Sequence, residues 1–151
     1  MSSPFLMIRL LSAVYWFDEA LQESLRVSGQ QPVSRAQSLL LANLAVGEHR
    51  AARLARNLGV TRQAISQTIS ELESRGVVTT ETDPEDGRAR IVEFSDQAAP
   101  LRRAAQQILT ELEQILEKRA GARNFRALYA ALDADWGEPP TIDVAARTGR
   151  G

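Results

Sequence analysis

The segment from residue 62 to residue 70 places five polar side chains beside an apolar stripe, with no acid among them. The stripe consists of Ile65, Ile69 and Leu72, whose spacing of four and three is typical of a helix that faces a core. The polar side chains are Arg62, Gln63, Ser66, Gln67 and Ser70. Arginine can donate two hydrogen bonds to guanine, glutamine can pair with adenine, and serine adapts to either. This face therefore offers the chemistry that reads base edges in a DNA major groove.

The charges around this helix favour the same interpretation. Between His49 and Ser70 the chain has four arginines and no acid. An ordinary solvated helix mixes acids and bases, so an exposed helix on a structural scaffold is the less favoured alternative. The whole chain carries a net charge of only −1, and residues 50–94 contain seven arginines and seven acids. Only the local distribution of charge therefore points to a polyanionic partner.

Capping signals define the helices that must position this face. Thr61 can accept a hydrogen bond from a first-turn N–H, and Gly76 can supply the left-handed stop at the other end. A preceding short helix, roughly 50–58, ends at Gly59. The spacing thus predicts two short helices joined by a tight turn, a helix-turn-helix.

A β-hairpin is predicted to follow directly. Residues 77–80 are β-branched, residues 83–87 have turn composition, and residues 89–94 return as a second strand. Asp86, Arg88 and Arg90 would lie at or near its tip. A helix-turn-helix followed by a hairpin predicts a mainly α fold with a small β-hairpin wing, a winged helix-turn-helix.

The N-terminal segment 5–17 has only two residues that are not apolar, Arg9 and Ser12. It is too short to span a bilayer, which takes about 20 residues, and it lacks the features of a signal peptide. We therefore expect a cytoplasmic protein with no membrane partner. A helix that is apolar all round must be covered on several sides, which predicts a second subunit. Amphitropic membrane binding by this helix remains an alternative, although it has few basic residues.

The C-terminal segment supplies a matching apolar stripe. Its residues recur at intervals of four and three, as in two packed helices: Leu101, Ala105, Ile108, Leu112 and Ile115. A shorter helix after Gly121 is expected to place Phe125, Leu128, Tyr129 and Leu132 on one face. We predict a homodimer held by both chain ends. We predict that the chain consists of four segments: residues 1–33 for N-terminal dimerisation, 34–95 for the winged helix, 96–136 for C-terminal dimerisation and 137–151 as a disordered tail.

Composition excludes several kinds of chemistry. The chain has no cysteine, so neither a disulfide framework nor a thiol switch can form, and its one histidine, His49, cannot build a histidine metal cluster. We expect His49 near a helix start, as a cap or facing solvent. Asp83, Glu85 and Asp86 could hold a hard cation, but a solvated wing tip is the favoured interpretation. No nucleophile–base pair or phosphate loop is present, so we predict no enzyme activity and no cofactor.

These segments resemble the MarR family of bacterial transcriptional regulators over about residues 34–135. The resemblance rests on Ser34-x-x-Gln37, on Leu58-Gly59-Val60-Thr61, on Leu72-Glu73-Ser74-Arg75-Gly76-Val77-Val78, and most specifically on Asp83-Pro84-Glu85-Asp86-Gly87-Arg88-Ala89.

The resemblance implies roles for particular residues and for the whole protein. Arg88 would enter a minor groove, with Asp86 bracing its guanidinium. It also implies a homodimer on double-stranded DNA, a crevice for a small-molecule effector, and repression. Tyr15, Trp16 and Phe17 could line such a crevice, or they could be core. A winged helix that docks another protein without reading DNA is the alternative function.

Overall fold

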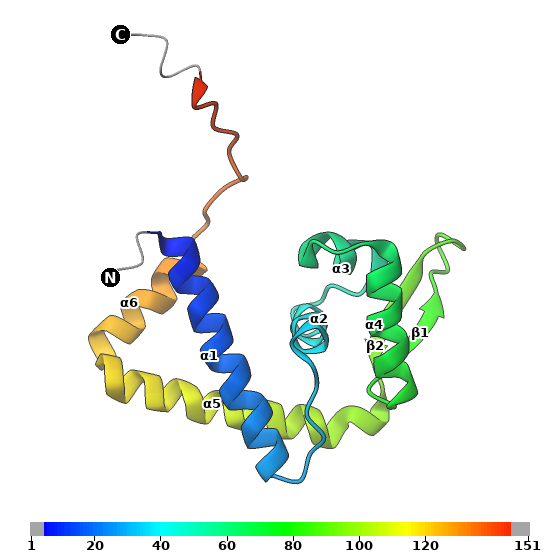
Figure 1. Cartoon of the computed structure of the whole chain (residues 1–151), viewed down its shortest axis with the longest axis horizontal. Helices are drawn as coiled ribbons and strands as arrows, with labels where there is room; N and C mark the ends of the chain where they lie inside the picture. Colours follow the sequence, from blue (N-terminus) through cyan, green and yellow to red (C-terminus); the bar gives the residue numbers. More distant parts are fainter. Residues whose placement is uncertain (1–4, 146–151) are drawn as a thin grey trace. The chain divides into compact units, whose positions relative to one another are not determined.

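The computed structural model describes residues 5–145 and consists mainly of helices, with one β-hairpin (Figure 1). The chain divides into two compact units, of which the first ends at Glu113 and the second begins at Gln114. In chain order the elements are α1 (Leu6–Val27), α2 (Arg35–Ala45), α3 (Ala51–Leu58), α4 (Arg62–Ser74), β1 (Val78–Thr82), β2 (Arg90–Phe94), the 3-10 helix η1 (Asp96–Ala98), α5 (Ala99–Ala120) and α6 (Ala122–Asp133).

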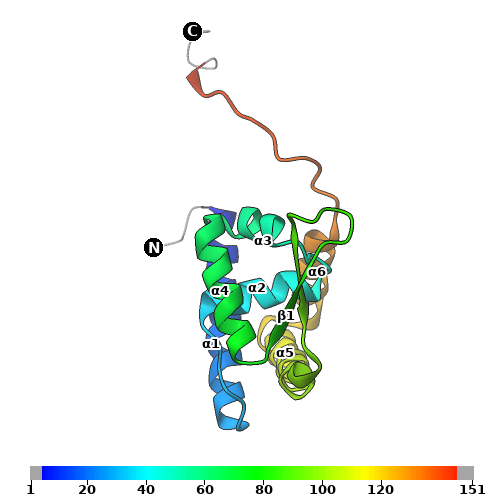
Figure 2. The ribbon, with the colours of Figure 1, turned by 90° about the vertical axis from the view of Figure 1, so that its right-hand side faces the viewer.

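The predicted winged helix-turn-helix is confirmed in the first unit. Helices α2, α3 and α4 and the hairpin share one hydrophobic core, and α4 stands beside β1 (Figure 2). Every element contributes a side chain that is fully or almost fully removed from water: Leu40 from α2, Leu54 from α3, Ile65, Ile69 and Leu72 from α4, Val78 from β1 and Val92 from β2. The apolar stripe of α4 therefore faces inward as the spacing predicts.

Local signals explain where these helices begin and end. Ser34 and Gln37 form a reciprocal capping box at the start of α2, with side-chain to backbone hydrogen bonds of 3.2 Å and 3.0 Å. At the end of α4, Gly76 has a φ of 70°, and the N–H of Val77 donates to the carbonyl of Leu72 at 2.9 Å. This positive φ favours glycine, whereas the nearest atom to an added Cβ is Oε1 of Gln97 at 2.5 Å, the end of a flexible side chain that can move.

The hairpin is antiparallel, with Val78 opposite Phe94 and Thr82 opposite Arg90. The segment before α3 adds an isolated bridge to β2, in which Arg50 pairs with Ile91. His49 belongs to this junction, because its Nδ1 lies 2.9 Å from the carbonyl of Val92, which can only accept. The expectation that His49 would cap a helix or face solvent is therefore wrong. Through this hydrogen bond the His49 ring connects the segment before α3 to β2 of the wing.

Helix α1 is longer than the apolar segment 5–17 that predicts it, because it continues to Val27. Polar residues enter in its second half, where Asp18 is buried and pairs with Arg35 of α2. In the first half many large apolar side chains are exposed: Phe5, Leu6, Met7, Ile8, Leu11, Val14, Tyr15 and Trp16. This part of α1 is an unusually apolar surface for a water-soluble helix.

The second unit contains the end of α5 and the whole of α6. The α6 side chains predicted to share one face include Leu128, Tyr129 and Leu132, all of them exposed. Residues 137–144 carry no helix or strand and, like Ala145, are exposed; the remaining residues of the predicted tail, 146–151, lie outside the described residues. Between residues 5 and 145, no helix has both the length and the apolar character that spanning a membrane requires.

Candidate nucleic-acid interface

Helix α4 presents its polar face from a capped N-terminus. The Thr61 hydroxyl accepts a hydrogen bond from the N–H of Ala64 at 3.1 Å, so Thr61 acts as the cap that the sequence predicts. Of the five predicted base-reading residues, Ser66 is half-buried, and the others are exposed, namely Arg62, Gln63, Gln67 and Ser70. All five lie on one helix whose opposite stripe is in the core, so the face is held as a unit.

A cleft of about 450 Å³ lies between α3, the start of α4 and the wing. Its charged lining consists of five arginines and one acid: Arg50, Arg53, Arg62, Arg88, Arg90 and Asp86. These side chains come from four separate parts of the fold, and only tertiary packing brings them together. A concave surface with this excess of guanidinium groups suits the phosphate backbone of a nucleic acid.

Asp86 and Arg88 are joined at the wing tip by a hydrogen bond to the backbone. The Asp86 carboxylate accepts a hydrogen bond from the backbone N–H of Arg88 at 3.1 Å. The N–H of Ala89 donates to the carbonyl of Asp86 at 2.9 Å. Asp86 therefore shapes the turn that carries Arg88. The side chain of Arg88 is exposed on this turn.

Arg90 is the first residue of β2, directly after the wing turn, and contacts its neighbours. Its Nη2 donates to the Thr80 hydroxyl at 3.3 Å and lies 3.9 Å from Oε2 of Glu73. The Thr80 hydroxyl donates in turn to Oε1 of Glu73 at 2.9 Å. These contacts connect β2, β1 and α4, so Arg90 has a structural role in addition to lining the cleft.

Asp83 is buried, with 3% of its surface exposed, so the expectation of a wing tip solvated at all three carboxylates is wrong for this residue. Its Oδ2 lies 3.0 Å from Nη2 of Arg50, whereas Glu85 is at the surface. In residues 5–145, no group of three or more histidines, cysteines and carboxylates is arranged to hold a metal ion.

The C-terminal half of α4 is held by a polar cluster. The side-chain amide of Gln37, which is buried, donates to Glu71 at 3.1 Å. Arg75 donates to Gln37 Oε1 at 3.2 Å and to the carbonyl of Pro32 at 2.9 Å. Gln67 donates to the same Glu71 at 3.3 Å. Glu71 thus also binds Gln67, one of the predicted base-reading side chains.

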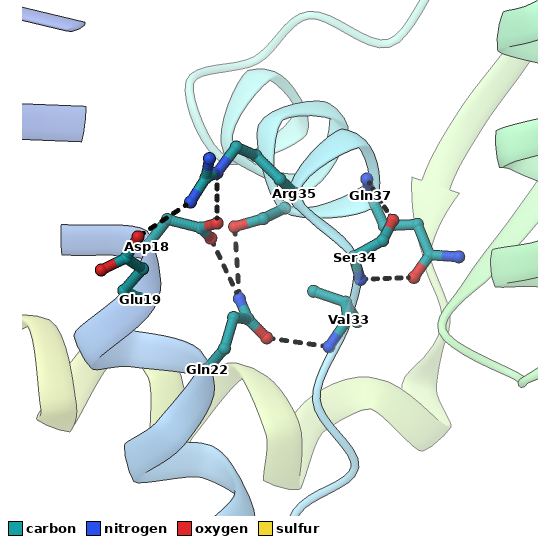
Figure 3. A network of polar contacts seen from close by, with 8 residues as sticks. Asp18, Glu19, Gln22, Val33, Ser34, Arg35 and Gln37 are labelled. Carbon is teal, nitrogen blue, oxygen red and sulfur yellow. Dashed lines mark hydrogen bonds and ion pairs between the residues drawn. The ribbon is translucent and has the colours of Figure 1, made fainter. Parts of the chain in front are cut away.

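A second polar cluster connects α2 to α1 (Figure 3). Gln22 accepts a hydrogen bond from the N–H of Val33 at 2.8 Å and donates to Asp18 at 3.2 Å. Asp18 also accepts from Nε of Arg35 at 3.1 Å. This ion pair connects α1 to α2 of the winged-helix lobe, because Asp18 lies on α1 and Arg35 on α2. Loss of Arg35 would leave the buried carboxylate of Asp18 without its cation, which is unfavourable. The polar second half of α1 is therefore connected to the winged-helix lobe.

A separate crevice of about 210 Å³ lies among α1, α2, the end of β2 and α5. Most of its lining is apolar, and the polar groups in it are Gln22, Ser38, Arg102 and Gln106. The guanidinium of Arg102 lies 4.2 Å from the centre of the Phe94 ring. The described residues that line it do not include Tyr15, Trp16 or Phe17.

The structure brings together part of the predicted site. Arg62, Ser66, Asp86, Arg88 and Arg90 line the cleft, whereas Thr61, Gln63, Gln67 and Ser70 lie elsewhere on α4. Sequence reasoning did not assign Arg50 and Arg53 to the site. The signal that could have found them is the run of arginines without acids that begins at Arg50.

Comparison with known proteins agrees with this geometry. Residues 31–89 match the model of the MarR family. The winged helix of this chain is therefore similar to that of the MarR family. The matched segment begins just before α2 and ends in the turn of the wing, so it contains α4 and most of the cleft lining.

Solved structures extend the similarity beyond the winged helix. The transcriptional regulator PA4135 is 21% identical, with a TM-score of 0.70 over 86% of this chain and 94% of that chain. Wild-type MarR from E. coli in its apo form is 22% identical, with a TM-score of 0.62 over 87% and 96%. The transcriptional repressor CouR, solved bound to a 23-mer DNA duplex, is 26% identical, with a TM-score of 0.64 over 86% and 91%. No curated protein matches the chain significantly. The fold is that of MarR-family transcriptional regulators.

Proposed function

We propose that this protein is a MarR-like transcriptional regulator that binds a pseudo-palindromic DNA site as a homodimer and acts as a repressor. The observation that carries the proposal is the cleft between α4 and the wing, with five arginines and a single acid in its lining. Beside it, the exposed Arg62 and Gln63 offer donors and acceptors for base edges. A dimer with two-fold symmetry presents two such helices, so its half-sites should lie about one helical turn apart.

Binding to the DNA that flanks the protein's own gene tests this proposal. Affinity should fall steeply as salt rises, because arginines that contact phosphates release counterions. A winged helix that docks another protein would lack this salt dependence. Measuring the affinity by fluorescence anisotropy at several salt concentrations separates the two functions.

Replacing Gln63 by alanine is expected to remove about 1–3 kcal/mol of discrimination at one base pair in each half-site. Gln63 is exposed near the start of α4, where a glutamine can bond the edge of an adenine. The measurement compares affinities for a set of operators that differ at single positions. Gln107→Ala, which removes an exposed glutamine from α5, is the matched control. A Gln63→Ala variant that ranks every operator as the wild type does would contradict this role.

Replacing Arg88 by alanine is expected to weaken binding to specific and non-specific DNA by similar factors. Arg88 is exposed on the wing, and an interaction with the DNA backbone carries little base information. The slope of log affinity against log salt should fall by about one for each phosphate that a subunit no longer binds. Arg103→Ala on α5 is the control, since it removes the same charge from outside the cleft. A salt titration that overlays that of the wild type would show that the wing does not touch DNA.

The exposed apolar surface supports a dimer held by the chain ends. Phe5 and the first half of α1 together leave eight large apolar side chains exposed, and α6 leaves three more. A surface of this kind is typical of an obligate interface, which buries about 2,000 Å² or more. We accordingly assign residues 1–33 and 96–136 to dimerisation and residues 34–95 to DNA binding.

The crevice beside Phe94 is the place where we propose that a small effector binds. Its mainly apolar lining with a few polar groups is typical of ligand sites. The crevice is lined in part by α2 and the end of β2. A bound effector would therefore contact elements that position α4 and the wing. Relief of repression by such an effector would follow from movement of those elements.

A further inference from the structure

The wing begins at a carboxylate that is almost completely buried. Asp83 follows β1 directly and is 3% exposed. Its Oδ1 accepts a hydrogen bond from the backbone N–H of Glu85 at 2.9 Å, and its own N–H donates to the carbonyl of Ala89 at 2.9 Å. Asp83 therefore closes the turn that carries Asp86 and Arg88.

The other oxygen of this carboxylate depends on one cation. Oδ2 of Asp83 lies 3.0 Å from Nη2 of Arg50, and it has no hydrogen-bond partner within the described chain. A buried carboxylate oxygen without compensation is strongly unfavourable. Glu85 also lies near this guanidinium, at 4.0 Å, but it is largely exposed, so water screens its charge. Arg50 is thus the group that makes burial of Asp83 tolerable.

Arg50 is anchored at the start of α3. It is the residue that precedes α3, and its backbone pairs with Ile91 of β2. The adjacent His49 carbonyl accepts from the N–H of Val92 at 2.8 Å. Arg50 therefore joins the first helix of the helix-turn-helix, the returning strand and the wing turn. A two-stranded hairpin has little stability of its own, so such a contact decides where its tip lies.

We infer that Arg50 is a positioning residue of the DNA interface: through its ion pair with Asp83 it fixes the wing relative to α3 and α4, and so places Arg88. The inference rests on the proposed DNA-binding function. A wing turn that is already fixed loses less conformational freedom when DNA binds, which strengthens the contact made by Arg88. Arg50 contributes to affinity mainly through Arg88 and not by touching phosphate itself.

A double-mutant cycle on DNA binding by the full chain tests this coupling. Arg88→Ala is measured in the wild-type, Arg50→Ala and Arg53→Ala backgrounds. Arg53 is the matched control, because it lines the same cleft but pairs with Glu48 at 3.7 Å. If Arg88→Ala weakens binding about tenfold in the wild type, we expect less than about threefold in the Arg50→Ala background and about tenfold in the Arg53→Ala background. Equal factors in all three backgrounds would overturn the inference.

Two further variants separate the ion pair from the turn. Asp83→Asn keeps an oxygen that can accept from the Glu85 N–H, but it removes the charge that Arg50 compensates. It should reduce the Arg88→Ala factor as Arg50→Ala does, and it serves if Arg50→Ala does not fold. Arg50→Lys keeps a cation and should restore much of the coupling. An Asp83→Asn variant with the wild-type Arg88→Ala factor would exclude positioning by the ion pair.

Amide hydrogen exchange tests the link without DNA. The N–H groups of Asp83 and Ala89 are both bonded within the wing turn. They should exchange faster in Arg50→Ala than in the wild type, and at the wild-type rate in Arg53→Ala. Unchanged exchange in Arg50→Ala would overturn the inference. A wild-type chain without salt-dependent DNA binding would instead overturn the proposed function, and the exchange result would still decide whether Arg50 holds the wing.

Discussion

Replacing Leu11 by aspartate is expected to convert the proposed homodimer into monomers. Leu11 lies in the middle of the apolar half of α1, and 46% of its surface is exposed in the single chain. If a partner subunit covers this surface, the new carboxylate is buried without a cation, at a cost of about 3–5 kcal/mol. A two-fold interface contains the substitution twice, so the cost arises at both copies.

Sedimentation of the wild type and the variant at micromolar concentration measures this effect. Val46→Asp is the matched control, since Val46 is an equally apolar residue that is 83% exposed in the turn after α2 and belongs to another element. The control should sediment as the wild type does. DNA affinity of Leu11→Asp should fall with the dimer, because one winged helix contacts only one half-site. A wild-type chain that is a stable folded monomer would contradict the prediction at once.

Replacing Leu72 by alanine is expected to lower the free energy of unfolding by about 2–5 kcal/mol. Leu72 is 0% exposed at the centre of the winged-helix core, where a smaller side chain leaves a cavity. The stripe that contains Leu72 packs α4 against the core. The variant should therefore also bind DNA more weakly, because α4 is held less firmly in position. Ile65 and Ile69 share this stripe, so the effect extends to the whole reading face.

Urea unfolding at one fixed protein concentration measures this change in stability, because dimerisation makes stability depend on concentration. Ser70→Ala is the control on the same helix. Ser70 is exposed, so its replacement should change the free energy of unfolding by no more than about 0.5 kcal/mol. A Leu72→Ala variant as stable as Ser70→Ala would show that α4 is not packed through this stripe.

The amino-acid sequence by itself determined the elements of the winged helix and their ends. Thr61 caps α4, Gly76 ends it in the left-handed region, and Ser34 with Gln37 opens α2, each by contacts within a few residues. Such contacts depend on neighbours in the chain, so spacing alone predicts them. The apolar stripe of α4 was predictable for the same reason, since helix geometry sets which residues share a face.

The length of α1 was not predictable from its apolar segment. The hydropathy pattern changes at Asp18, yet the helix continues because Arg35 and Gln22 satisfy that carboxylate. The sequence alone does not distinguish a buried acid from a solvated one, because the residue that pairs with the buried acid lies on another helix. Asp83 gave a wrong expectation for the same reason, and its partner Arg50 precedes α3, far away in the chain.

Tertiary structure alone decided which arginines face one another. The five arginines of the cleft come from the segment before α3, from α3, from α4 and from the wing. Folding brings them together in one cleft: Arg50, Arg53, Arg62, Arg88 and Arg90. Folding also gives these arginines different surroundings. Arg90 contacts Thr80 and Glu73, and Arg50 pairs with Asp83. The side chain of Arg88, in contrast, is exposed. Charge and residue type are properties of the sequence, but the distance between two charges exists only after the core has packed.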